Sequence, residues 1–444
     1  MKPQTKKRLA AACAAMLSLS MLAACTDTGE SAGTASAASD TASATGESVT
    51  ITYSQFSAGD TNIDTLEAMI AAFEEDNPDV KVELQTTGYD DYFTALATKM
   101  AGNGAPDCFE LNLENFLSYA IRDSIEPLDE YFDRLGASKD DYATGPLNAA
   151  TYDGKVYGIP QTYSTVVLFY NKDLFDQAGV SYPTEDWTWE DETEAAEKIR
   201  ALGDDIWGMY QPVTYNELYK AVQQNGGSLV SDDGTEFTMN SPENVETLSM
   251  MLSRACGDNR VMPNTVDLAG RGDSDLFKEG KLGMLLTGIW MFDDFSQNIQ
   301  DFDWDIAVEP GNTQKATHLF SNMAAINKNI DQEKKDAAFR FLNYMATNEK
   351  CVKLRVDASW ELPVVADETE LAPYLEQTPP DNRQAVMDSM EYSVAPPALI
   401  EYGAVVDTMT PILDDAVLNN RPAQETLDEI QEQLTSKNLM NPKS

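Results

Sequence analysis

The chain has 444 residues, of which 42% are hydrophobic and 24% charged, and its 74 Asp and Glu against 31 Lys and Arg give a net charge of −43 at pH 7. Such a negative field excludes nucleic acid as a partner, and we attribute it to solubility rather than to a specific cationic ligand. The length is too great for one hydrophobic core and predicts two domains of roughly 200 residues each.

The first 48 residues predict an exported, lipid-anchored protein. Four basic residues within positions 1–8 precede an apolar run from Leu9 to Ala24. At about 16 residues, this run is shorter than the ~20 of a membrane-spanning helix and is typical of a signal peptide. It ends in "LAAC", the pattern of a bacterial lipobox, so we expect a signal peptide over residues 1–24 and lipidation of Cys25. Residues 25–48 would then be the lipidated cysteine and a flexible tether, because 19 of the 23 residues after Cys25 are Ser, Thr, Ala or Gly.

Strands and helices alternate between residues 49 and 111. Val49–Tyr53 and Val80–Leu84 have the period of strands, and the helix between them would bury Leu66, Met69, Ile70 and Phe73. A second helix would bury Phe93, Leu96, Ala97 and Met100, and "CFEL" would be a third strand. This βαβαβ order predicts an open α/β sheet, whose ligands lie beyond the carboxyl ends of its strands. We assign the loops 54–60 and 104–107 to such ends.

The second half repeats the alternation. In "YGIPQTYSTVVLFYNKDLF" (157–175), the apolar run after the proline predicts a buried strand that leads into a helix. Thr188 with Asp191 predicts a capping box for a helix over 189–202, and Ser241-Pro242 predicts the start of another. Further strands are expected at 206–210, 282–287 and 305–308, and a hairpin at "SDDGTEF".

The sequence offers little catalytic chemistry. His318 is the single histidine, and we interpret it as structural. No nucleotide-binding, zinc-protease or nucleophile-elbow motif follows a predicted strand, so we expect no cofactor and no metal. A pair of glycosidase carboxylates stays possible among so many acidic residues. Cys108, Cys256 and Cys351 lack metal-ligand spacing, and we expect free, mostly buried thiols.

Aromatic residues are the positive indication of a ligand. Phe56, Tyr163, Trp290 and Trp360 lie beside small or turn residues at the ends of predicted elements, not within helical stripes. Flat amphipathic rings of this kind are suited to covering the faces of sugars.

Five segments occur in the order typical of one family. They are "VTITYSQF", "GNGAPDCFEL", "DGKVYGIPQTYSTVVLFYNKDLFDQAGV" with "PTEDWTWEDE", "FKEGKLGMLLTGIWMF" and "SNMAAINKNIDQEKKDAAFRFLNYMATNE". From about Val49 to its C-terminus, the chain resembles the extracellular solute-binding proteins of family 1, which are lipoprotein receptors of ABC sugar importers and distantly similar to maltose-binding protein.

The resemblance implies an α/β fold of the two-lobed, periplasmic-binding-protein-like type II, with a ligand cleft between the lobes. Residues 49–159 plus 315–360 would form the N-terminal lobe, and residues 160–314 plus 361–444 the C-terminal lobe. The chain would cross between them near Ile159–Ser164, Pro310–Phe320 and Trp360–Val365, and rotation about these crossings would close the lobes over the ligand.

The resemblance also implies the ligand, its contacts and the partners. A mono- or oligosaccharide would stack on Trp290, with further contacts among Asp107, Tyr163, Gln55, Phe56, Asn322, Trp360 and Glu361. The closed form would be recognised by ABC permease subunits. We expect a monomer, held by its N-terminal lipid on the extracytoplasmic face of the cell membrane of a Gram-positive bacterium. Two alternatives stay open: a membrane-anchored glycoside hydrolase, and a carbohydrate sensor or adhesin component without a transport role.

Overall fold

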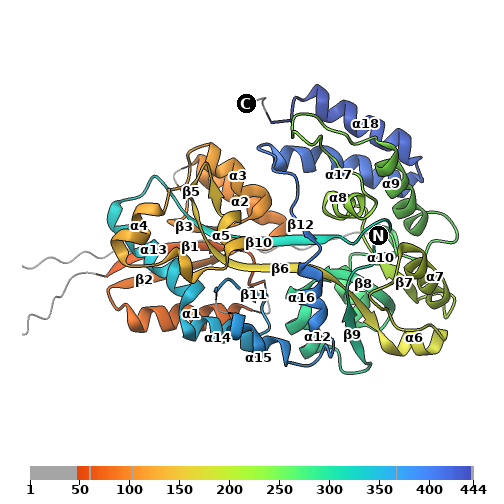
Figure 1. The fold of residues 1–444 in the computed structure, drawn as a ribbon, viewed down its shortest axis with the longest axis horizontal. Helices are drawn as coiled ribbons and strands as arrows, with labels where there is room; N and C mark the ends of the chain where they lie inside the picture. The colour runs from red at the N-terminus through yellow and green to blue at the C-terminus, as the bar shows by residue number, and fades with distance from the viewer. Residues whose placement is uncertain (1–47, 60–61, 103, 367, 442–444) are drawn as a thin grey trace, which may run out of the picture. The chain divides into compact units, whose positions relative to one another are not determined.

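The computed structural model describes residues 48–59, 62–102, 104–366 and 368–441, and its main feature is a ten-stranded mixed sheet (Figure 1). The predicted signal peptide, Cys25 and nearly all of the predicted tether lie outside the described residues. Along the main path of the sheet the strand order is β2-β1-β3-β10-β6-β8-β7. Helices cover both faces of this sheet in each of two lobes, as expected for an α/β protein.

The first lobe begins with the predicted βαβαβ unit. Its elements are β1 (Val49–Gln55), α1 (Ile63–Asp76), β2 (Val80–Thr86), α2 (Tyr89–Ala101) and β3 (Cys108–Asn112). Strand β1 pairs in parallel with both β2 and β3, which confirms the order expected from the sequence. Helix α1 buries the predicted stripe Leu66, Met69, Ile70 and Phe73 against one face of the sheet.

Helix α2 packs differently from the prediction. Ala97 is exposed, whereas Tyr92 and Leu96 are buried. The Tyr92 ring extends under the sheet, and its hydroxyl lies 3.0 Å from the carbonyl of Ser54 and 2.8 Å from that of Glu110. Because its hydroxyl can bond to these two carbonyl groups, Tyr92 is buried on α2, whereas the small Ala97 is not.

The remaining elements of the first lobe surround this unit. They are α3 (Leu113–Ile121), α4 (Asp129–Leu135), η1 (Lys139–Asp141), α5 (Thr144–Ala149), β4 (Thr151–Tyr152), β5 (Lys155–Val156), α13 (Gln332–Thr347) and α14 (Glu349–Asp357). Helices α1 and α13 cover one face of β1 and β3, while α2 and α3 cover the other.

Three segments join the lobes side by side. They are β6 (Gly158–Asn171), β10 (Thr317–Ile326) and β11 (Leu362–Pro363). The first half of β6 pairs with β10, and its second half pairs with β8 and β9 of the second lobe, so one strand runs through both lobes (Figure 1). Tyr163 is the meeting point, since it is paired with Ser321 on one side and Leu362 on the other. The predicted apolar run is core, with Val167, Leu168 and Phe169 fully buried.

The second lobe follows the predicted alternation closely. Its strands are β7 (Trp207–Tyr210), β8 (Leu282–Gly288), β9 (Trp304–Ala307) and the short β12 (Ser393–Val394). Its helices are α6 (Lys172–Ala178), α7 (Trp189–Arg200), α8 (Tyr215–Gln224), α9 (Pro242–Ala255), α10 (Thr265–Leu268), α11 (Asp273–Lys278), η2 (Ile289–Met291), α12 (Phe292–Asn298), η3 (Glu368–Leu371), α15 (Ala372–Leu375), α16 (Gln384–Met390), α17 (Tyr402–Asn419) and α18 (Ala423–Ser436).

Local predictions in this lobe hold with small differences. The Thr188–Asp191 capping box and the Ser241 cap with its following proline are both present. Around "SDDGTEF", a single antiparallel bridge between Val230 and Phe237 forms instead of a full hairpin. The cysteines are free as predicted: Cys108 and Cys351 are buried, and Cys256 is half-buried. Within the part of the chain that the structure describes, no helix is both long and apolar enough to cross a membrane.

Candidate functional site

The carboxyl ends of strands from both lobes lead into the same region. In the first lobe, β3 ends at Asn112, whose side chain caps helix α3 by accepting a hydrogen bond from the backbone N–H of Asn115. This cap places Glu114 in the first turn of α3. In the second lobe, β8 ends at Gly288 and is followed by Trp290. The side chains of Glu114 and Trp290 both point toward the amino end of the crossing strand β10. There Glu114 contacts His318, and Trp290 contacts Phe320.

A group of aromatic and polar side chains fills the space between the lobes. We call it the interlobe cluster, and it consists of Glu114, Tyr215, Tyr219, Trp290, His318, Phe320 and Tyr402. The Nε2 atom of His318 lies 3.1 Å from Oε1 of Glu114. The His318 ring stacks on Phe320 with centroids 3.5 Å apart, and Phe320 meets the Trp290 ring edge-on at 5.1 Å. On the other side, Tyr219 meets His318 edge-on at 5.0 Å.

The tyrosines of the cluster continue it into the helices of the second lobe. Tyr215 lies 6.0 Å from Tyr219 and 5.5 Å from Tyr402, measured between ring centroids. The hydroxyl of Tyr402 donates to Asn216, and that of Tyr219 donates to the carbonyl of Val394. Three hydrogen-bonded or stacked tyrosines from α8 and α17 therefore lie together in the second lobe, facing helix α3 of the first lobe.

Trp290 owes its position to a glycine. A Cβ atom built on Gly288 would lie 1.9–2.1 Å from three atoms of the Trp290 ring, so the indole rests directly on the backbone of Gly288. Trp290 and Phe320 are half-buried, whereas the histidine and the three tyrosines are buried. These two rings are thus the accessible part of the interlobe cluster.

Burial controls the protonation of the cluster. It lowers the pKa of His318 below its ordinary value, and the hydrogen bond and charge of Glu114 offset only part of this effect. Burial also raises the pKa of Tyr215 and of Tyr219, and the negative charge of Glu114 adds to it. At neutral pH the cluster therefore contains neutral phenols and a neutral imidazole, together with the Glu114 carboxyl group.

A second group of predicted site residues meets where the three crossing segments pair. Glu361 is buried with a φ of +54°, and the hydroxyl of Ser164 donates to its carboxylate at 2.9 Å. The side-chain amide of Asn322 donates to the hydroxyl of Thr162 at 3.2 Å. Burial raises the pKa of Glu361, and the polar groups of Thr162, Ser164 and Asn322 act in the opposite direction. Together with half-buried Tyr163, this group lies on the strands about which the lobes would move.

Trp360, Gln55 and Phe56 are held by their own lobe. Trp360 is 2% exposed, belongs to the core of the first lobe, and has the Arg355 guanidinium 4.2 Å from its ring. Gln55 donates to the hydroxyl of Thr86 and accepts from the backbone N–H of Ala58, which fixes the turn after β1. Phe56 is 8% exposed and packs edge-on against Tyr89, which is 47% exposed.

Asp107 lies away from the other predicted residues. The loop 104–107 precedes β3, which runs parallel to β1, so this loop is at the amino end of a strand and its assignment to a carboxyl end is wrong. The Asp107 carboxylate accepts hydrogen bonds from the backbone and hydroxyl of Thr52 at 2.8 and 3.0 Å and pairs with Lys334 at 2.9 Å. We therefore leave Asp107 out of the candidate site.

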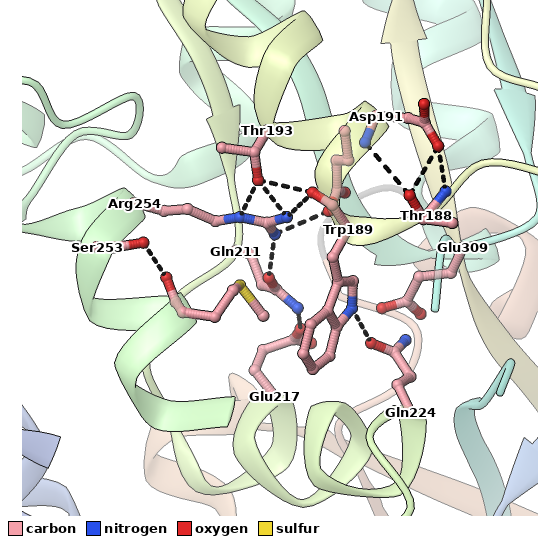
Figure 2. Close-up of polar contacts among 12 residues, drawn as sticks. Thr188, Trp189, Asp191, Thr193, Gln211, Glu217, Gln224, Ser253, Arg254 and Glu309 are labelled. Carbon is pink, nitrogen blue, oxygen red and sulfur yellow. Dashed lines mark hydrogen bonds and ion pairs between the residues drawn. The ribbon is translucent and has the colours of Figure 1, made fainter. Parts of the chain in front are cut away.

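A network of buried charges lies next to the interlobe cluster, within the second lobe. Lys220, which is fully buried, pairs with Glu217 at 2.7 Å and with Glu309 at 2.5 Å. Glu217 accepts from Gln211, and Gln211 accepts from Arg254, which pairs with Glu192 at 2.7 Å. Figure 2 shows Arg254 at the centre of its part of the network, bonded to the carbonyl of Trp189 and the hydroxyl of Thr193. We call these residues the buried charge network.

Sequence reasoning missed most of the interlobe cluster. His318 is buried, in agreement with its interpretation as structural, whereas Glu114 was not singled out because 204 positions separate it from His318. One indication was available for Glu114, because it follows the carboxyl end of the predicted strand "CFEL", where the ligands of α/β sheets lie. No local pattern marks the tyrosines of α8 and α17, whose buried faces resemble those of any amphipathic helix.

Comparison with known proteins agrees with the two-lobed fold. Residues 59–350 match the family profile of the bacterial extracellular solute-binding proteins. A solved ABC substrate-binding protein from Listeria monocytogenes, in complex with cycloalternan, is 43% identical with a TM-score of 0.85, over 89% of this chain and 100% of that chain. The arabinooligosaccharide-binding protein of Bacillus subtilis is 26% identical over 54% of this chain and 56% of its own length. At 18% identity, UgpB from Mycobacterium tuberculosis in complex with glycerophosphocholine shares the fold, with a TM-score of 0.75 over 88% of this chain and 98% of that chain.

Two lobes joined by paired crossing strands, with an aromatic cluster between them, define a solute-binding protein of the hinged type. The chain belongs to the bacterial extracellular solute-binding protein family. Its role is that of the substrate-binding component of an ABC importer.

Proposed function

We propose that the chain binds an uncharged oligosaccharide at the interlobe cluster and delivers it to the permease subunits of its importer without chemical change. The observation that carries this proposal is the pair of half-buried rings, Trp290 and Phe320, which lie at the junction of the two lobes. Aromatic faces complement the apolar faces of sugar rings, and the neighbouring polar groups can bond to hydroxyls.

The ligand contacts are distributed over both lobes. Trp290 provides the stacking surface from the second lobe, and Glu114 provides hydrogen-bond acceptors from the first. Tyr163, Asn322 and Glu361 would contribute from the crossing strands, and Phe56 with Tyr89 from the turn after β1 and the start of α2. A ligand that touches both lobes stabilises the closed arrangement by the contacts it gains there.

Cycloalternan is the first candidate ligand, because the 43% identical Listeria protein was solved with it. We would titrate the purified chain with cycloalternan, maltotriose and arabinooligosaccharides by calorimetry. A dissociation constant on the order of micromolar, corresponding to about −8 kcal/mol, is expected for the cognate ligand. Chromatography of the same mixtures after prolonged incubation should recover the saccharide intact. Steady release of reducing ends would support a hydrolase instead.

Trp290→Ala tests the site itself. Loss of the stacking surface should weaken saccharide binding by at least tenfold, equivalent to about 1.4 kcal/mol, while the fold stays intact. Trp187→Ala is the matched control, because Trp187 is also a half-buried tryptophan of the second lobe but packs on Phe175. Undiminished binding by the Trp290 variant would contradict the site assignment.

The anchoring of the protein forms a further part of the proposal. The lipobox at Leu22–Cys25 and the tether after it support a protein held by lipid on the outer face of a Gram-positive cell membrane, and we take it to act as a monomer. Cys25→Ser should release the protein into the medium, measured by blotting membrane and culture fractions. Metabolic labelling with palmitate should mark the unmodified protein alone, and label on the Cys25→Ser variant would refute lipidation at this residue.

A further inference from the structure

The contact between Glu114 and His318 links the first lobe to a crossing strand. Glu114 is 4% exposed and His318 is 1% exposed, so both side chains are removed from water. The pair lies between helix α3 and helix α8, with the Tyr219 ring packed against the imidazole. Movement of the lobes about the crossing strands would open this contact.

Three polar atoms at this contact lack partners. Among the described residues, Oε2 of Glu114, Nδ1 of His318 and the hydroxyl of Tyr215 are buried without a hydrogen bond. In the neutral tautomer that donates from Nε2 to Glu114, the Nδ1 atom of His318 is an acceptor. Buried polar atoms without partners are unfavourable, and a ligand that supplies hydrogen-bond donors would satisfy Oε2 of Glu114 and Nδ1 of His318, while the Tyr215 hydroxyl can donate or accept.

Positive charge is not available to balance an anion at this contact. The charged groups that act on His318 are Glu114, Lys220 and Glu217, from helices α3 and α8. Lys220 is fully buried and already pairs with two carboxylates, Glu217 and Glu309. A phosphate or carboxylate on the ligand would therefore face the Glu114 carboxyl group and the acceptor Nδ1 of His318, with the Tyr215 hydroxyl as a donor but with no unpaired cation among the charged groups that act on His318.

We propose that the Glu114–His318 pair determines the charge class of the ligand, accepting hydrogen bonds from the hydroxyl groups of an uncharged saccharide and excluding solutes that carry phosphate or carboxylate. The inference rests on the proposed function, because it concerns the same site. The fold does not set the charge class by itself, since a protein with the same fold holds glycerophosphocholine.

The test compares neutral and anionic probes on the unmodified protein and on two variants. We would measure calorimetric binding of cycloalternan and maltotriose as neutral probes, and of glycerol 3-phosphate and maltose 6′-phosphate as anionic ones. Glu114→Gln keeps the shape of the side chain but removes its charge and replaces one acceptor with a donor. Glu126→Gln is the control, because Glu126 is another partly buried carboxylate of the first lobe, paired with Lys335.

The expected result has two parts. The unmodified protein should bind a neutral probe and give no heat with either anion. Glu114→Gln should weaken the neutral probe at least tenfold and reduce the preference over the anion, whereas Glu126→Gln should change neither. Thermal unfolding of each variant establishes that it is folded.

Each contrary outcome has a distinct meaning. If the unmodified protein binds an anionic probe as tightly as a neutral one, the inference is wrong and the proposed importer role stands. This outcome does not depend on whether any variant folds. Unchanged preference in a folded Glu114→Gln variant would overturn the assignment to this pair. Failure of every probe to bind the unmodified protein would refute the proposed saccharide ligand, and the inference with it.

Discussion

Replacing Glu309 by Gln should remove a step from the pH dependence of the protein's stability. Glu309 is 1% exposed, pairs with Lys220, and lies 3.1 Å from the hydroxyl of Thr317. That hydroxyl has a single proton, which it can donate either to the carbonyl of Val166 at 2.8 Å or to Glu309. When the Thr317 proton goes to Val166, a protonated Glu309 can in turn donate to the Thr317 oxygen, so this contact is compatible with the protonated acid.

The size of the step follows from the pKa of Glu309. Burial raises this pKa from 4.5 to about 7, and the attraction of Lys220 opposes the rise without cancelling it. The folded protein therefore binds more protons than the unfolded chain between these two values, and the free energy of unfolding falls as the pH rises through this interval. The stabilising contribution is complete below pH 4.5 and is lost above 7, a difference of roughly 3 kcal/mol at 1.36 kcal/mol per pH unit.

Denaturant unfolding at pH 5 and pH 8 measures this difference. Glu309→Gln mimics the protonated acid, so it should match the unmodified protein within about 1 kcal/mol at pH 5 and exceed its stability by up to about 3 kcal/mol at pH 8. Glu279→Gln is a control, because ion pairs lower the pKa of this exposed carboxylate and move its titration below the tested interval. An equal change with pH in the Glu309 variant and the unmodified protein would show that the proton is bound elsewhere in the buried charge network.

Two further predictions concern single contacts. Gly288→Ala should push the Trp290 ring from its place, because the new Cβ would lie about 2 Å from three of its atoms, and calorimetry should show saccharide binding weakened as much as in Trp290→Ala. Arg254→Met leaves Glu192 as an uncompensated buried charge, so unfolding experiments at pH 7 should show a loss of about 3–5 kcal/mol. Adding Glu192→Gln to the Arg254 variant should restore part of that loss, and no recovery would mean that packing, not charge, is responsible.

The sequence predicts local elements well because their causes are local. The four buried residues of α1 recur with the helical period, and the Thr188 capping box needs only positions three residues apart. The family resemblance adds the two-lobed arrangement, which periodicity alone does not provide. Burial on α2 is less predictable, because Tyr92 is selected by carbonyl groups of strands 38 and 18 positions away.

The site depends on contacts that no local pattern encodes. Trp290 is recognisable because it follows a glycine at the end of a strand, but its partner Phe320 comes from another crossing segment. Charged pairs such as Lys220 with Glu309 join positions far apart in the chain, and in a sequence with 74 acidic residues nothing distinguishes the buried ones. The wrong placement of the loop 104–107 has a different origin, since the carboxyl-end rule was applied to a loop that precedes its strand.

Strand β10 explains how one short segment serves both the ligand site and the buried charge network. His318 and Phe320 are two positions apart and therefore point to the same side of the strand, where they stack and meet Glu114 and Trp290. Successive side chains of a strand point to opposite faces, so Thr317 lies on the other face of β10. There its hydroxyl contacts the carbonyl of Val166 and the carboxyl group of Glu309. A change at Glu309 can thus alter stability through Thr317 while leaving the stacked rings in place, whereas a change at Glu114 acts on the face where we propose that the ligand binds. The pH dependence of folding and the charge preference of binding should consequently be separable by mutation, although the residues that transmit them are neighbours in the chain.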